Sequence, residues 1–267
     1  MPRPRRGFSS IGSQGYDVAI ERGGMYGFDF VELTMNDYPR DVLSANADRI
    51  RSLAEEHDVD LVVHLPHGSD DNMLASSDRA VRESSLETMQ DAVLAAGDIG
   101  AEKAVLHIDA TDHLQLLEAG QPDVLYDTVS ELKATADEVG VEICAENMLG
   151  RKRRRISLRD LVDIVAETGV SVTIDTGHAA TMGYSSADIA SYVEQYGESV
   201  SHFHLNDTHG SSDDHLAFGA GRIDFAEIFA ALPADWVGTL CLEIKTDDYG
   251  YIEYSGQRLD AVLEAVL

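Results

Sequence analysis

The sequence predicts an α/β protein folded as a single (β/α)8 TIM barrel over residues 1–267. Short apolar runs with the character of buried strands alternate with longer stretches in which apolar residues recur every three or four positions. A strand followed by a helix, repeated along the chain, implies a parallel sheet. Eight such units in about 250 residues match the size of this barrel. A doubly wound open sheet is the alternative, but the glycine-rich fingerprint expected after its first strand is missing.

The eight predicted strands are apolar runs of four to seven residues. In order they are a short run near Phe8 to Ile11, then 28–33, 61–65, 103–108, 141–146, 170–175, 200–205 and 238–244. Helical periodicity is clearest over 78–100 and 158–169, and a last helix is expected over 255–267. No linker, low-complexity segment or break in composition divides the chain, so one domain is expected.

Acidic residues dominate the composition. The chain has 48 Asp and Glu against 20 Lys and Arg, a formal net charge of −28, and a sequence pI near 4.4. Such a surface stays soluble and repels most polyanions. We hypothesise a halophilic protein from a high-salt cytoplasm, where screening makes so large a like charge tolerable.

Targeting signals and disulfides are not expected. The first 15 residues carry cations but no apolar core of a signal peptide, and no run approaches the roughly 18 apolar residues of a membrane span. Cys144 and Cys241 both lie inside apolar runs, which argues against a disulfide framework. A cytoplasmic protein that does not enter the membrane is therefore expected.

Polar residues gather where the predicted strands end. Six lie at or next to the carboxyl end of an apolar run: His64, His107, Glu146, Asp175, His204 and Glu243. Barrel enzymes build their sites at that end. Because side chains alternate along a strand, Glu146 shares a face with Cys144, and Glu243 with Cys241, so both acids are expected to point into the barrel.

Together these residues predict a metal centre. Taken singly, a histidine at a strand end is more often structural than a ligand, whereas a buried carboxylate without a partner costs several kcal/mol. Adding His178 in "DTGH" and Asp213 and His215 in "SDDHLAFGAG" gives five histidines and four acids. Imidazole and carboxylate ligands without thiolate suit Zn²⁺, Mn²⁺, Co²⁺ or Mg²⁺. So many converging carboxylates require a cation to offset their repulsion.

The motifs "VHLPHG", "LHID", "AENM", "DTGHAATMGY", "HLNDTHGSSDDHLAFGAGRIDF" and "LEIK" run through the whole predicted barrel. In this combination the sequence resembles the xylose isomerase-like TIM barrels, which include sugar phosphate isomerases and epimerases and endonuclease IV. The resemblance implies a shared metal site made by Glu146, Asp175, His204 and Glu243. It also implies a second site, with His64 and His107 bridged by Glu146, and a third made by His178, Asp213 and His215. One to three ions, zinc or manganese, are expected.

Two chemistries follow from the resemblance. In the isomerase and epimerase branch one ion polarises a sugar carbonyl, and Glu146 and Glu243 move the proton. In the endonuclease branch, an AP endonuclease, several ions act on a phosphodiester. The histidine at position 215 favours the second branch, because ketose epimerases tend to have an arginine there. The acidic loop residues Asp70 and Asp71 and the absence of a basic stripe argue against DNA.

We favour the isomerase or epimerase acting on a small sugar or sugar phosphate, with the phosphoesterase as the alternative. A non-catalytic metal-binding barrel is a third reading, disfavoured because a structural site does not need ligands from so many strands.

A basic run follows the predicted fifth strand. The sequence "GRKRRR" places five cations at 151–155, in a loop expected on the same face as the metal ligands. It is either a solvated flank of the next helix or an anion-binding segment, since arginine suits phosphate. We predict that Arg151, Arg153, Arg154 and Arg155 bind the substrate. Lys245 is either a further substrate contact or a rim charge. His67, His113 and His209 have no expected role, whereas His202 is a candidate for orienting a ligand.

Overall fold

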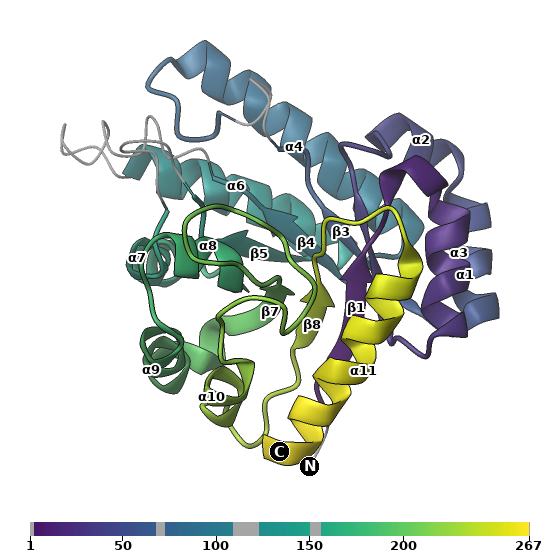
Figure 1. The fold of residues 1–267 in the computed structure, drawn as a ribbon. Helices are drawn as coiled ribbons and strands as arrows, with labels where there is room; N and C mark the ends of the chain where they lie inside the picture. The colour runs from purple at the N-terminus through teal and green to yellow at the C-terminus, as the bar shows by residue number, and fades with distance from the viewer. Residues whose placement is uncertain (1–2, 68–72, 109–122, 150–155, 267) are drawn as a thin grey trace.

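The computed structural model describes residues 3–67, 73–108, 123–149 and 156–266 and forms a closed barrel of eight parallel strands in sequential order (Figure 1). The predicted (β/α)8 TIM barrel is therefore confirmed. The strands are β1 (Arg5–Ser9), β2 (Phe30–Thr34), β3 (Asp60–His64), β4 (Lys103–Leu106), β5 (Glu142–Glu146), β6 (Ser171–Asp175), β7 (Val200–Leu205) and β8 (Thr239–Leu242).

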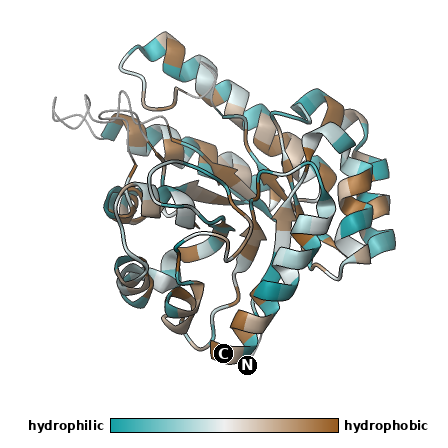
Figure 2. Ribbon diagram, in the orientation of Figure 1, coloured by the Kyte–Doolittle hydropathy of each residue, from teal (hydrophilic) through white to brown (hydrophobic). Residues whose placement is uncertain are grey.

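Helices surround the barrel and cover its outer face (Figure 1). They are α1 (Tyr16–Met25), α2 (Arg40–Ala45), α3 (Ala47–His57), α4 (Arg79–Ile99), α6 (Asp123–Val139), α7 (Leu158–Thr168), α8 (Thr176–Thr181), α9 (Ser186–Tyr196), α10 (Phe225–Ala230) and α11 (Tyr249–Val266), with short 3-10 turns η1 (Gly12–Gln14) and η2 (Gly197–Ser199). Figure 2 shows hydrophobic residues on the strands and hydrophilic ones on the outer sides of the helices. None of the described helices is both long and apolar enough to cross a membrane.

Two predicted boundaries are wrong. The first strand is Arg5–Ser9 and not the run near Phe8 to Ile11. Arg5 and Arg6 hide it in the sequence, because their side chains leave the barrel to pair with acids, Arg5 with Asp60 at 2.6 Å. The last helix begins at Tyr249, six residues before the predicted start at 255.

Capping side chains mark the starts of several helices. Asp78 accepts hydrogen bonds from the first backbone N–H groups of α4. Ser157 with Asp160, and Ser185 with Asp188, form capping boxes at the starts of α7 and α9. Each box satisfies backbone donors that the first helical turn leaves free.

The strands bury both faces. Their outward side chains join the helices in one large core, while Phe30, Val62 and Cys241 form a small separate cluster inside the barrel. Beside this cluster the barrel also holds the buried polar side chains of Glu32, His202 and Thr239.

The chain closes on itself where its ends meet. β1 pairs with β8, and Arg6 forms a 2.7 Å ion pair with Asp260 of α11. The two termini accordingly lie side by side in Figure 1.

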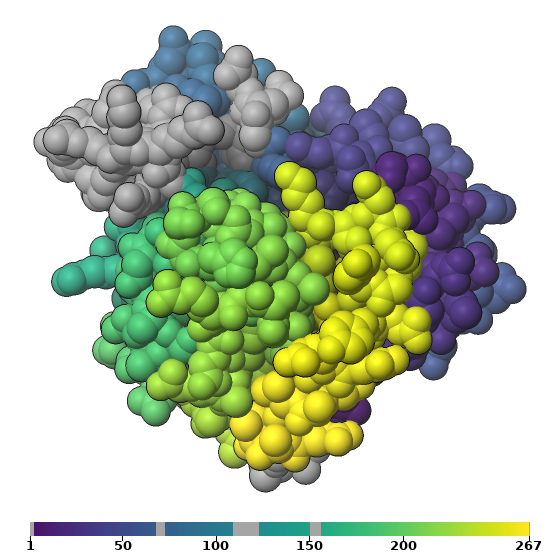
Figure 3. All heavy atoms as spheres, in the orientation of Figure 1, coloured from purple at the N-terminus to yellow at the C-terminus, as the bar shows by residue number. Residues whose placement is uncertain are grey.

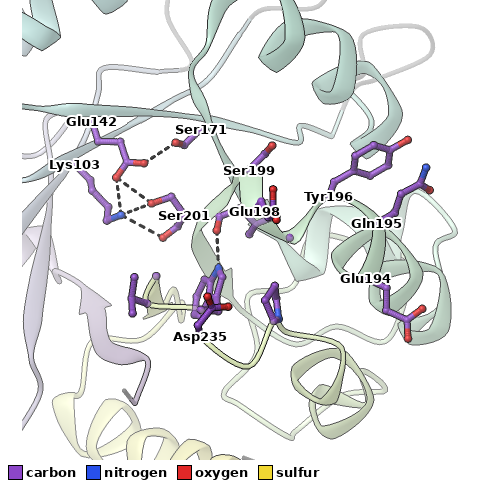
Figure 4. Close-up of a pocket in the computed structure, with 16 residues that line it drawn as sticks. Lys103, Glu142, Ser171, Glu194, Gln195, Tyr196, Glu198, Ser199, Ser201 and Asp235 are labelled. Atoms are coloured by element: carbon purple, nitrogen blue, oxygen red, sulfur yellow. Dashed lines mark hydrogen bonds and ion pairs between the residues drawn. The ribbon is translucent and has the colours of Figure 1, made fainter. Parts of the chain in front are cut away.

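The end of the barrel where the strands begin carries its own polar network. There Lys103 donates to Glu142 at 2.8 Å, and Glu142 accepts from Ser171 at 2.5 Å and from Ser201 at 3.0 Å (Figure 4). These residues line a cavity of about 810 Å³ with Trp236, which donates to the Val200 carbonyl at 2.6 Å. Because every donor in this network is matched and the predicted ligands lie at the opposite end, we attribute stability to it and no chemistry.

Candidate metal centre

The nine predicted ligands come together at the end of the barrel where the strands finish. His64, Glu146 and Asp175 are the last residues of their strands. His204 is one residue before the end of β7, while His107 and Glu243 directly follow β4 and β8. The other three lie beyond strand ends: His178 in α8, and Asp213 and His215 between β7 and α10.

Glu146 lies at the middle of this cluster, and its Oε2 atom faces two imidazoles. His107 Nε2 is 2.8 Å from Glu146 Oε2, and His64 Nε2 is 3.6 Å from it. The two Nε2 atoms are 3.0 Å apart. Three potential ligand atoms from three strands thus surround one point.

The other oxygen of Glu146 faces a second group. His178 Nδ1 and His204 Nδ1 each lie 3.3 Å from Glu146 Oε1. Asp175 joins Glu146 and His204 in a potential ligand set, and Glu243 Oε2 is 3.6 Å from His204 Nδ1. This group corresponds to the shared site expected from the resemblance.

A third group forms around Asp213. Its two oxygens lie 3.6 Å from His178 Nε2 and 3.2 Å from His215 Nε2. His215 Nδ1 is also 3.4 Å from Glu243 Oε2. Backbone hydrogen bonds tie the segments together, because the Lys245 N–H donates to the His215 carbonyl at 3.0 Å. Figure 3 shows the light-green segment after β7 against the yellow C-terminal part of the chain.

The donor set fits divalent cations. Each group offers imidazole nitrogens and carboxylate oxygens, which suit zinc or manganese. Among the described residues, the buried atoms Glu146 Oε1, His204 Nδ1 and Asn206 Oδ1 lack a hydrogen-bond partner. Buried polar atoms are seldom left unpaired. An ion shared by Glu146 and His204 would satisfy two of them.

The "DTGH" motif builds part of the site through a direct passage from strand to helix. Asp175 caps α8 by accepting from the His178 N–H at 2.6 Å. Asn147 fixes the same turn, donating to the Asp175 carbonyl at 2.9 Å and accepting from its N–H at 2.8 Å. A Cβ on Gly177 would lie 1.8 Å from Asn206 Oδ1, so only glycine fits between them. His215 holds a backbone φ of +45°, a costly conformation for histidine.

Burial and neighbouring charges shift the pKa values of the residues in this cluster in different directions. Burial alone would raise the pKa of Glu146, but His204 and His107 lower it well below its usual range. Burial raises the pKa of Glu243 to about 7, although His204 and His215 oppose the rise. Burial lowers the pKa of His107 to about 4, which leaves this ring neutral and able to act as a ligand.

Sequence reasoning missed four residues near the centre. Glu32 is fully buried on β2 and lies 3.1 Å from His204. Asn206 donates to Asp175 at 2.8 Å, and the His67 ring lies 4.5 Å from that of His64. Asn147, described above, is the fourth. Glu32 had a readable signal, since it is an acid in the apolar run "FDFVEL" and, unlike Asp29, shares the inward parity of Phe30.

For several residues named from the sequence, the structure does not test the predicted role. Arg151, Arg153, Arg154 and Arg155, like Asp70, Asp71 and His113, lie outside the described residues. Lys245 is exposed near the site and His209 is exposed on the loop after β7. His202, a candidate for orienting a ligand, is fully buried with its Nε2 3.2 Å from Glu32 Oε2.

Comparison with known proteins agrees with this architecture. An uncharacterized protein of Methanocaldococcus jannaschii is 30% identical over 206 residues, covering 75% of this chain and 69% of that protein. A probable endonuclease 4 of Mycobacterium tuberculosis is 27% identical over 199 residues, covering 71% and 74% of the two chains.

A solved structure described as a D-tagatose 3-epimerase-like protein is also similar, with a TM-score of 0.83, 27% identity and coverage of 98% of both chains. Residues 25–266 match the family described as xylose isomerase-like TIM barrel. With its closed barrel and with relatives from both the epimerase and the endonuclease IV branches, the chain belongs to the xylose isomerase-like TIM barrel family.

Proposed function

We propose that the protein is a divalent-metal-dependent hydrolase that cleaves a phosphoester of a small, sugar-containing substrate. The observation that carries this proposal is the position of Glu146 between two groups of imidazoles. One oxygen lies 2.8 Å from His107 Nε2, and the other lies 3.3 Å from both His178 Nδ1 and His204 Nδ1. A carboxylate whose two oxygens face different imidazoles is suited to be a ligand shared between ions.

This position bears on the two roles that the sequence analysis gave to Glu146, as ligand and as proton carrier. A general base needs a free oxygen within hydrogen-bond reach of the substrate. Both oxygens of Glu146 face imidazoles instead, and its side chain is 1% exposed. We therefore assign Glu146 to ligation, and to Glu243 the proton-transfer role that the two acids shared.

The nine ligands divide among three ions, zinc or manganese, in the sets named above. Divalent ions at such a site lower the pKa of water and neutralise charge on phosphoryl oxygens. A site for one ion does not use His64, His107, Asp213 or His215. Potential ligand atoms nevertheless lie within 4.8 Å of one another in each of three groups: His64, His107 and Glu146; His178, Asp213 and His215; and Glu146, Asp175 and His204. The presence of potential ligands for three ions supports the hydrolase over a reaction that uses a single ion.

The substrate we propose is small. Among the described residues, the N-terminal arginines are committed to acids, as when Arg5 pairs with Asp60 at 2.6 Å and Glu102 at 2.5 Å where the strands begin. They form no basic stripe at the site, and a polynucleotide would meet a surface of net charge −28. The basic run 151–155 and Lys245 are our proposed contacts for one phosphorylated sugar.

Sugar epimerisation is the second candidate, and one observation favours it. Burial brings the pKa of Glu243 to about 7, the value that suits proton transfer at neutral pH. The solved structure named as D-tagatose 3-epimerase-like is consistent with this reading. Epimerisation needs only the shared site, so Glu243 and Asp175 would matter to it, while His107 and His215 would not.

Metal content and three variants distinguish the candidates. We would measure ions per chain by elemental analysis after purification at high salt. Activity would be assayed on phosphorylated sugars, on an abasic-site duplex and on a panel of ketoses. H107Q and H215Q test the second and third sites, D175N tests the shared site, and H209Q is the matched control because His209 is exposed on the same face.

If the protein is the hydrolase, we expect close to three ions per chain in the wild type and one fewer in H107Q. Phosphate release should fall roughly 100-fold or more in H107Q, since a catalytic ion contributes several kcal/mol. H209Q should behave as the wild type. One ion per chain, with ketose interconversion that survives H107Q, would establish the epimerase instead, and strand nicking of the duplex would contradict the small substrate.

A further inference from the structure

An acid that none of the three ligand sets uses is buried in the barrel directly beneath them. Glu32 is 0% exposed on β2 and lies next to His202 and His204 on β7. The structure assigns to Glu32 a positioning role: it holds the imidazole of His204 so that Nδ1 is the nitrogen presented to a metal ion. This inference rests on the proposed metal site but not on the reaction performed there.

The two nitrogens of His204 face different groups. Nε2 lies 3.1 Å from Glu32 Oε2. Nδ1 points the other way, 3.3 Å from Glu146 Oε1 and 3.6 Å from Glu243 Oε2. His204 therefore links the carboxylate inside the barrel with the ligand cluster at its mouth.

Imidazole binds a cation through a nitrogen without a proton, and the hydrogen bond made by the other nitrogen sets which one that is. When Nε2–H of His204 donates to Glu32, Nδ1 carries the free lone pair. The negative charge of Glu32 also makes the imidazole a stronger ligand. Without Glu32 the ring is free to keep its proton on Nδ1, where it blocks the ion.

His202 and Thr239 support the arrangement. His202 Nε2 is 3.2 Å from the same Glu32 oxygen, and His202 Nδ1 is 2.6 Å from Thr239 Oγ1. The Phe30 ring, two residues before Glu32, lies 6.0 Å from the His202 ring. Glu32 is thus held in place by groups from β7 and β8 as well as by its own strand.

Packing alone gives no reason for an acid at this position. Glu32 lies just above the apolar cluster of Phe30, Val62 and Cys241, where a hydrophobic side chain of similar size would fill the barrel. Burying a charged carboxylate carries a large desolvation penalty, and replacing buried ionic groups by apolar ones is often neutral or stabilising. The cost is understandable if Glu32 serves the metal ligand above it.

The test measures metal binding without substrate. E32Q keeps the shape of the side chain and E32L fills the space with an apolar group. Each would be stripped of metal and titrated with zinc against a chromophoric chelator. E102Q is the matched control, because Glu102 is a partly buried acid where the strands begin, paired with Arg5 at 2.5 Å.

We expect both variants of Glu32 to bind the ion at the shared site about 10- to 100-fold more weakly, the usual cost of losing such a partner. E102Q should match the wild type. Metal-free E32L should remain folded, with the far-UV circular dichroism spectrum of the metal-free wild type, so that a loss of zinc affinity is separated from a loss of the fold. Unchanged zinc affinity in E32Q, with the wild type binding its ions, would overturn the inference while leaving the proposed function standing.

A second arrangement is tested with E32Q, with cobalt-substituted protein and with one more variant, C241S. Glu32, His202, His204 and Cys241 lie close enough to hold an ion of their own. In that case E32Q would lose a whole ion, and the cobalt-substituted wild type would show a thiolate-to-cobalt absorption band that C241S lacks. Either result would overturn the positioning role. A wild-type protein that binds no divalent ion would overturn this inference and the proposed function together.

Discussion

Stripping the metal should make the stability of the protein fall as pH rises, and His215 gives the clearest measure. Burial alone would lower the pKa of His215, but its hydrogen bond to Asp213 and the charge of Glu243 raise it to about 9. His215 Nε2 lies 3.2 Å from Asp213 Oδ1, and its Nδ1 lies 3.4 Å from Glu243 Oε2. In the metal-free protein these carboxylates hold the ring in its charged form.

The sign of the pH dependence follows from the direction in which the pKa of His215 is shifted. The folded pKa of His215 lies above the reference value of 6.5, so the charged ring stabilises the fold fully below pH 6.5. That stabilisation disappears as the pH rises through about 9. The difference between the two pKa values corresponds to about 3 kcal/mol, at about 1.4 kcal/mol per pH unit. About 2 kcal/mol of it is lost between pH 7.5 and 9.5.

Between pH 7.5 and 9.5 the change in charge of His215 is distinct from those of Glu243 and His107. Glu243 titrates near pH 7 and has mostly lost its proton by pH 7.5. The pKa of His107 is about 4, so this ring does not change its charge there. The pKa values of His178 and His204 are well above 6.5, because nearby acids overcome the effect of burial, and they add to the decline in the same direction.

The assay is thermal denaturation followed by circular dichroism at fixed KCl, with chelated and zinc-loaded protein. For a protein of this size about 2 kcal/mol is a fall of roughly 4–8 °C in Tm. The zinc-loaded protein should not decline, because the ion takes the place of the proton. H215N should remove about 2 kcal/mol of the metal-free decline between pH 7.5 and 9.5 and leave the part due to His178 and His204, whereas H209N should remove none. A metal-free Tm that stays level or rises between pH 7.5 and 9.5 would refute the reasoning.

Three further predictions concern the rest of the chain. The Tm should rise with KCl, because salt screens the repulsion of a net charge of −28; a Tm independent of KCl would contradict the halophilic assignment. Replacing Arg153, Arg154 and Arg155 by serine should raise KM for an anionic substrate several-fold and leave ions per chain unchanged, with a constant KM as the contrary result. E142Q should lower the free energy of unfolding by about 1–3 kcal/mol, because the neutral amide leaves the charge of the buried Lys103 without its ion-pair partner. K103M should cost less, because the Glu142 side chain is 40% exposed and reaches water; urea denaturation would compare them.

The fold was predictable because hydrophobic periodicity and strand length agree along most of the chain. The strand over 141–146 and the helix over 158–169 were expected within one residue of Glu142–Glu146 and Leu158–Thr168. The first strand was misplaced because its charged residues gain their partners only in the folded barrel, as Arg5 does with Glu102 at 2.5 Å. A single sequence does not reveal which charges will be paired.

The residues of the candidate site were predictable for a topological reason. In a parallel barrel all strand ends meet at one face, so His64 and Glu146 come together although 82 positions separate them. Their relative orientation was not predictable. That the two oxygens of Glu146 face different imidazoles depends on side-chain torsions and on the turn after β6, where Gly177 leaves room for Asn206.

The two ends of the barrel balance charge in opposite ways, and the contrast bears on the metal. Where the strands begin, acids meet permanent cations: Glu142 pairs with Lys103 at 2.8 Å and Asp60 with Arg5 at 2.6 Å. At the candidate site Glu146 and Asp213 form ion pairs, within the described residues, with imidazoles alone. Imidazoles balance carboxylates only while protonated, which costs them their role as ligands. Among the described residues, Lys103 and Arg5 thus balance acids where the strands begin, while the acids of the candidate site carry a negative charge that divalent cations are suited to neutralise.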